Sequence, residues 1–165
     1  MIRYIRFPTP LGRVFATAND TAVTGIYFVG QRHAPAISPE WKEDPRHAPL
    51  AECACQVIGY LEGARDTFAL PLAPVGTPFQ QRVWREIARI PRGETLSYAE
   101  LAQRAGAPGA ARAAGAATGR NPLSVVVPCH RVVGSGGSLT GYAGGLDRKS
   151  RLLELEGARV ARAAA

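Results

Sequence analysis

A proline-bearing connector at residues 66–77 divides the sequence into two parts whose apolar residues follow different periods. Before the connector, apolar and polar residues alternate, as in strands that bury one face. After it, apolar residues recur every three or four positions, as on one face of a helix. This change predicts an α+β protein with a scaffold domain over residues 1–76, which includes the connector, and a mostly helical domain over residues 77–165.

The first part predicts an antiparallel sheet with one helix. Its three alternating segments are joined by short turns, which connect antiparallel neighbours, and they are residues 2–7, 13–18 and 22–29. Residues 30–46 are rich in proline and charge and predict a loop, whereas residues 49–63 have helical spacing. No catalytic residue types are concentrated here, so we interpret this part as a scaffold.

The second part predicts a helix followed by a helix-turn-helix. Thr77 can cap a helix that starts at Pro78. Ser97 has capping-box spacing at the start of a second helix, and a tight glycine-containing turn leads to a third over residues 109–119. Apart from Arg112, this third helix carries small side chains, so it can do little base readout but can approach a DNA backbone closely. Tight helix packing would explain the small residues equally well.

All of the excess positive charge lies in the second part. Residues 1–76 carry seven basic and seven acidic side chains, whereas residues 77–165 carry thirteen basic and six acidic ones. Eighteen of the twenty basic residues are arginine, which binds phosphate through two nitrogens and stacks on bases. An arginine-rich genome would not explain this asymmetry. We therefore expect a polyanion as the partner of the second part.

The three cysteines indicate a reducing compartment. Cys53, Cys55 and Cys129 cannot all pair, and their spacing indicates no disulfide framework. Cys53 and Cys55 lack the second ligand pair of a zinc site, so we expect two buried, inert thiols on a helix and no metal. The longest apolar stretches are too short for a membrane span, and the first residues favour a strand over a signal peptide. We therefore expect a cytoplasmic protein.

One segment of the second part places a nucleophile beside a base. Apolar residues 125–127 lead through Pro128 to Cys129 and His130. A cysteine attacks as a thiolate, which a nearby cation or a histidine base favours. Adjacent residues of a strand point to opposite faces, so this pair can act together only if the chain turns at Pro128 or a water links the two. The pair alone is a weak signal of chemistry.

The longer string Pro128–Val132, with Asn121 eight residues before the cysteine, resembles the active-site motif of the O6-alkylguanine-DNA alkyltransferases. The resemblance runs almost without gaps from Thr77 to Gly157. The further stretches that carry it are Thr77–Trp84, Gly93–Tyr98, Ala110–Ala113, Gly141–Leu146 and Leu152–Gly157. Residues 1–76 resemble the family only in their strand-rich layout.

The resemblance implies a DNA repair protein that transfers an alkyl group from O6 of guanine to the sulfur of Cys129. His130 would take the thiol proton through a water, and Glu156 would orient and compensate the imidazolium. Asn121 would fix the turn that carries the cysteine. Tyr98 would rotate the target phosphate and donate a hydrogen bond to the extruded guanine.

Some of these residues have simpler interpretations when the resemblance is set aside. Glu156 would be a solvated helix residue beside Arg151 or Arg159, and Tyr98 would be a core residue of an amphipathic helix. Arg131, next to the nucleophile, is expected to brace the structure or to help bind DNA rather than to act in the reaction.

The resemblance also implies how a stacked base is reached. Arg112 would enter the duplex from the minor groove and fill the space of the extruded base. The other implied DNA-binding residues are Ser97, Ala110, Ala113 and Gly115. The implied alkylguanine pocket consists of Val132, Tyr142, Ala143, Gly144, Thr118 and Ser124. Ala143 replaces a serine of some members, and Thr118 and Ser124 replace bulkier or more rigid residues, which leaves the range of alkyl groups open.

The implied reaction happens once per molecule, because nothing in the sequence offers a way to cleave a thioether. The damaged base is the donor, so no cofactor is implied. The expected partner is double-stranded DNA, bound by a monomer with salt-sensitive, nearly sequence-independent affinity. Reaction with O4-alkylthymine and cooperative binding stay open.

Three other functions compete with alkyl transfer. Relatives that keep the pocket but lack the cysteine bind lesions without repair, which Cys129 argues against. A transcription regulator would need more base readout than residues 109–119 offer. A cysteine–histidine hydrolase would need an oxyanion-hole motif, and none accompanies this pair.

Overall fold

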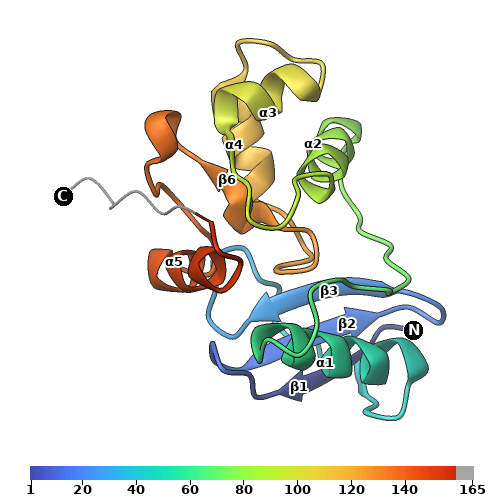
Figure 1. Ribbon diagram of the computed structural model, residues 1–165. Coiled ribbons are helices and arrows are strands. Elements are labelled where there is room, and N and C mark those ends of the chain that lie inside the picture. The colour runs from blue at the N-terminus through green and yellow to red at the C-terminus, as the bar shows by residue number, and fades with distance from the viewer. Residues whose placement is uncertain (159–165) are drawn as a thin grey trace. The chain divides into compact units, whose positions relative to one another are not determined.

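The computed structural model describes residues 1–158, which form two compact units (Figure 1). The first unit comprises Met1–Val75 and Pro122–Val126, and the second comprises Gly76–Asn121 and the described residues from Val127 onward. The predicted α+β class is confirmed, because the first unit contains the larger sheet and the second is mostly helical. Within the described residues, no helix is both long and apolar enough to cross a membrane.

The first unit contains a sheet with the strand order β3-β2-β1-β4. Strand β4 (Lys42–Glu43) pairs parallel with β1 inside the stretch that we expected to be a loop. That expectation is wrong at these two residues because both are exposed, so no apolar alternation marks the strand. The three predicted strands are present and pair antiparallel: β1 (Arg3–Phe7), β2 (Val14–Ala18) and β3 (Val23–Phe28).

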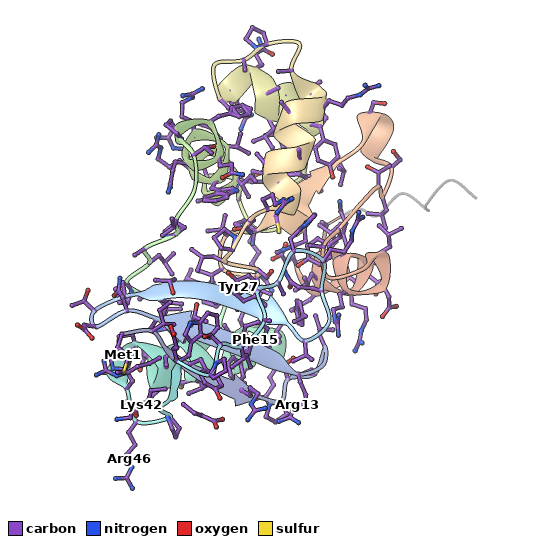
Figure 2. The ribbon with its side chains drawn as sticks, turned by 180° about the vertical axis from the view of Figure 1, so that it is seen from behind. Met1, Arg13, Phe15, Tyr27, Lys42 and Arg46 are labelled. Carbon is purple, nitrogen blue, oxygen red and sulfur yellow. The ribbon has the colours of Figure 1, made fainter. Side chains whose placement is uncertain are left out.

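Helix α1 (Ala48–Leu61) packs against β1, β2 and β3 (Figure 1). Cys53 is buried on its inner face, but Cys55 is exposed, so the expectation of two buried thiols is wrong for Cys55. Residues two positions apart are about 200° apart around a helix, so they cannot both face one sheet. On neighbouring strands, Phe15 and Tyr27 stack with their ring centroids 5.0 Å apart (Figure 2).

Residues 122–126 return to the first unit through backbone hydrogen bonds. The Ile26 N–H donates to the Pro122 carbonyl over 2.7 Å, and the Ser124 N–H donates to the Ile26 carbonyl over 3.1 Å. The compact units therefore interleave along the chain, whereas the predicted domains are contiguous. The sequence gives little sign of this return, because backbone pairing of this kind requires no particular side chains.

Up to residue 158, the second unit is built on four α-helices. Thr77 caps the first of them as predicted and forms a complete capping box with Gln80. The buried Trp84 indole N–H donates to the Ala117 carbonyl over 2.8 Å and so ties the first helix of this unit to the third. The four helices are α2 (Pro78–Ala88), α3 (Tyr98–Arg104), α4 (Ala111–Gly119) and α5 (Leu146–Leu155).

Ser97 begins α3 with only half of the predicted capping box. Its hydroxyl accepts from the Glu100 N–H over 3.1 Å and donates to the Glu100 carboxylate over 3.0 Å, so the carboxylate meets the hydroxyl rather than the Ser97 backbone. Ser97 also belongs to β5 (Leu96–Ser97), which pairs parallel with β6 (Val132–Val133). This short pairing joins the start of α3 to the chain that follows the single-turn helix η1 (Cys129–Arg131).

Candidate active site in the second unit

The chain turns at Pro128, as an interaction between Cys129 and His130 would require. Pro128 precedes η1 with φ −82° and ψ 65°, and its carbonyl accepts from the Arg131 N–H over 2.9 Å. The Cys129 N–H donates to the Val127 carbonyl over 2.8 Å. Cys129 and His130 therefore lie on a 3-10 turn and not on an extended strand, so their side chains are not forced to opposite faces.

Asn121 connects the end of α4 to this turn. Its side-chain amide donates to the Val127 carbonyl over 2.9 Å, and its backbone N–H donates to the Thr118 carbonyl over 3.2 Å. The same side chain interacts with the Cys129 thiol and lowers its pKa. The Asn121 side chain therefore contacts the backbone just before the cysteine turn.

The Cys129 thiol is buried, and desolvation raises its pKa above the ordinary value. Asn121, the positive charge of Lys149, the backbone of Cys129 itself and Tyr142 act in the opposite direction. The Tyr142 hydroxyl is buried and has no nitrogen or oxygen partner among residues 1–158, and its interaction is with this thiol. The site therefore surrounds the sulfur with groups that favour the thiolate and partly offset its desolvation.

His130 and Glu156 form a buried hydrogen-bonded pair. The distance from His130 Nε2 to Glu156 Oε2 is 2.9 Å, and neither side chain is exposed. Burial lowers the pKa of His130, and Glu156 opposes this effect. The alternative interpretation of Glu156 as a solvated residue beside Arg151 or Arg159 is wrong about solvation, because Glu156 is buried at the C-terminal end of α5. Arg159 lies outside the described residues.

The same carboxylate is held by Arg131. Its Nε donates to Glu156 Oε1 over 2.9 Å and its Nη2 to Oε2 over 2.8 Å, while Nη1 donates to the Ile90 carbonyl over 2.6 Å. Arg131 is itself buried, and these contacts fit the bracing role that we expected from the sequence.

Tyr98, at the first position of α3, directs its hydroxyl to the segment before α5. The hydroxyl donates to the Thr140 carbonyl over 3.2 Å, and burial raises its pKa, so the hydroxyl keeps its proton at neutral pH. A Cβ added to Gly115 of α4 would lie 3.6 Å from the Tyr98 ring. A small residue at position 115 thus gives the ring room, independently of any DNA contact.

Lys149 is a buried residue that the sequence interpretation missed. Its Nζ donates to the carbonyls of Val132, Thr140 and Gly141 over 2.6, 3.0 and 3.1 Å, and it lies 5.9 Å from the centre of the Tyr98 ring. Burial lowers the pKa of Lys149 to about 8. Lys149 shares its helical face with Leu152, Leu153 and Glu156, and this spacing was the available signal of burial.

The six residues of the implied pocket fall in different surroundings. Val132 and Gly144 are buried, and Tyr142 and Ala143 are half-buried in the segment before α5. The Thr118 hydroxyl donates to the Ala114 carbonyl one turn earlier in α4. The Ser124 hydroxyl donates to Gln31 within the first unit. The hydroxyls of Thr118 and Ser124 are therefore engaged inside their own units.

Helices α3 and α4 pack against each other and leave one face of α4 open. Arg112 and Ala113 are exposed, Ala110 is half-buried, and Ala114 and Ala117 are buried. The implied DNA-binding residues Arg112 and Ala113 therefore share an outer surface with little bulk. No group of three or more metal-ligating side chains occurs within residues 1–158.

A buried cysteine next to a buried histidine–carboxylate pair, in a unit whose α4 exposes Arg112, is typical of proteins that use a cysteine nucleophile. Two family models match the two parts of the chain. Residues 78–158 match the DNA binding domain of 6-O-methylguanine DNA methyltransferase, and residues 2–74 match its ribonuclease-like domain. The chain therefore belongs to the 6-O-methylguanine DNA methyltransferase family and is an enzyme of the methylated-DNA–protein-cysteine methyltransferase type.

Named relatives agree over almost the full length. A methylated-DNA–protein-cysteine methyltransferase of Mycolicibacterium paratuberculosis is 46% identical over 156 residues, which cover 94% of this chain and 93% of the relative. The crystal structure of Mycobacterium tuberculosis OGT in complex with DNA is similar with a TM-score of 0.87 and 41% identity, covering 94% of this chain and 92% of that one. An enzyme from Pyrococcus kodakaraensis, 26% identical, gives a TM-score of 0.63 over 95% of this chain and 99% of that one.

Proposed function

We propose that this protein repairs DNA by transferring the alkyl group of O6-alkylguanine to Cys129 in a single, irreversible turnover. The observation that carries the proposal is the buried turn with Cys129 and His130, which Asn121 contacts, together with the hydrogen bond from His130 to the buried Glu156. Family membership and the similarity to an OGT crystallised with DNA support the substrate class.

The reaction forms one bond and breaks one. The Cys129 sulfur attacks the alkyl carbon, an S–C bond forms, and the C–O6 bond breaks with its electron pair going to guanine. The thiol proton passes to Nδ1 of His130, which is buried without a hydrogen-bond partner among residues 1–158 and can accept it through a water. Glu156, which accepts from Nε2, compensates the imidazolium that results. The Tyr98 hydroxyl donates a hydrogen bond to the leaving guanine, and the proton held by His130 is released to solvent, from which the guanine anion takes up a proton.

A base inside a duplex must leave the stack before its O6 substituent can meet a buried sulfur. We propose that α3 and α4 act as a helix-turn-helix that approaches the minor groove, with Arg112 filling the vacated space. Ala110, Ala113 and Gly115 allow the close approach, and Ser97 holds the start of α3. Val132, Tyr142, Ala143 and Gly144 are the proposed wall of the pocket.

The donor is the damaged base, so the proposed reaction requires no cofactor. The product is an S-alkyl cysteine, which hydrolyses too slowly to regenerate the protein. We propose a monomer that binds duplex DNA through phosphates, with affinity that falls as salt rises. The excess of basic residues after position 76 supports this mode of binding.

Intact-mass measurement tests the proposal. Reduced, folded protein incubated with duplex DNA carrying O6-methylguanine should gain the mass of one methylene per molecule, on the peptide that contains Cys129. A second addition of damaged DNA should add nothing. Unmodified duplex is the control, and folded protein that binds the damaged duplex without gaining mass would be a lesion-binding module instead.

Replacing Arg112 with alanine should slow repair in duplex DNA but spare repair of free O6-benzylguanine, which needs no extrusion. Extruding a base costs a few kcal/mol, so losing the residue that fills the gap should slow duplex repair by about tenfold to a hundredfold. Single-turnover rates on the two substrates measure this. Arg89→Ala removes an exposed arginine that directly follows α2 and is paired with Glu86, and this variant is the matched control for lost charge. Equal slowing on both substrates would contradict the assigned role.

A further inference from the structure

Arg131 contacts the carboxylate of Glu156 more extensively than His130 does. One guanidinium donates to both carboxylate oxygens, through Nε and Nη2, and is anchored at its third nitrogen by the Ile90 carbonyl. A planar fork that holds both oxygens fixes the plane of the carboxylate as well as its position. His130 makes a single contact, from Nε2 to Oε2.

We propose that Arg131 is a positioning residue of the alkyl-transfer site, which orients Glu156 so that His130 keeps a proton on Nε2 and offers only Nδ1 to the nucleophile. This inference deepens the proposed function and rests on it. An ionised carboxylate can only accept hydrogen bonds, so the ring nitrogen that lies 2.9 Å from Oε2 must carry hydrogen. The other nitrogen, Nδ1, has no hydrogen-bond partner among the described residues and is therefore the available proton acceptor.

The guanidinium also limits how strongly Glu156 can favour the imidazolium. The charged groups that act on His130 are Glu156, Arg131 and Lys149. Burial lowers the pKa of His130, Glu156 raises it, and Arg131 and Lys149 lower it further. Without Arg131, Glu156 would compensate His130 alone, and a larger fraction of rings would carry a proton on Nδ1. Such rings cannot accept a proton from the thiol.

The protonation state of the ring is measurable in the wild-type protein. Nitrogen-15 NMR of labelled imidazole should show that Nε2 carries hydrogen throughout the titration and that Nδ1 is the nitrogen that gains a proton at low pH. A neutral ring protonated on Nδ1 would overturn the inference. This measurement requires no substrate, so its failure is separate from a failure to form the Cys129 adduct.

Substitutions of Arg131 separate positioning from bracing. In Arg131→Gln, the acidic limb of the single-turnover rate should move to higher pH, and the rate on that limb should fall about tenfold for each unit of pKa. Arg131→Lys keeps the positive charge, so the acidic limb of its pH–rate profile should stay near the wild-type position. The plateau rate of this variant should fall. Arg89→Gln is the control and should leave the profile unchanged. An unshifted acidic limb with only a lower plateau in Arg131→Gln would overturn the inference. If Arg131→Gln does not fold, Arg131→Lys decides, because an unchanged plateau in that variant would show that the two-nitrogen contact with Glu156 is not needed.

Discussion

Replacing Cys129 with alanine should leave a folded protein that binds duplex DNA carrying O6-methylguanine but gains no mass from it. The side chain is buried, so losing its sulfur should lower the free energy of unfolding by only about 1 kcal/mol. The other two thiols of the chain lie on α1 of the first unit, so the loss of reaction should be complete. Intact mass, peptide mapping and a duplex-binding titration on one preparation measure all three properties.

The other cysteines provide matched controls for this result. Cys55→Ala removes an exposed thiol of α1, and Cys53→Ala removes a buried one whose pKa burial raises to about 12. Both variants should take up one methyl group per molecule at Cys129, as the wild-type protein does. A methylated peptide from Cys129→Ala would show that another residue accepts the methyl group. Loss of duplex binding in that variant would show that the cysteine contributes to the fold of the DNA-binding face.

Replacing Glu156 with glutamine should strongly destabilise the second unit. The carboxylate accepts from His130 and from two nitrogens of Arg131, and it is completely buried. Removing one member of a buried ion pair leaves the partner charge uncompensated, which costs about 3 to 5 kcal/mol. The amide also has a donor where the carboxylate has an acceptor, so one of the existing hydrogen bonds must be lost.

Tryptophan fluorescence can follow this unit by itself. Trp84 is buried in α2, and Trp41→Phe removes the indole of the first unit, so urea unfolding of that variant reports on the second unit alone. Glu154→Gln changes an exposed carboxylate of the same helix and should alter stability by no more than about 0.5 kcal/mol. A loss below about 1 kcal/mol in Glu156→Gln would contradict the buried ion pair, since an exposed pair contributes no more than that.

Local patterns were sufficient to predict most secondary structure. Apolar alternation identified the three antiparallel strands, and the Thr77 and Ser97 caps located the starts of α2 and α3. Patterns failed where backbone pairing acts without a side-chain signature. Strand β4, the β5–β6 pairing and the return of residues 122–126 to the first unit are of this kind.

The sequence by itself determined the chemical groups: a cysteine next to a histidine, an asparagine before them, and a basic excess confined to residues 77–165. Only the tertiary structure decided the electrostatic environment of those groups. From the sequence, Glu156 had a solvated alternative and Lys149 was passed over, yet both are buried, because α5 turns the face that they share with Leu152 and Leu153 inward. Arg131 holds Glu156 across 25 sequence positions. Burial and such distant partners set the pKa of each group, and these properties exist only once the chain has folded.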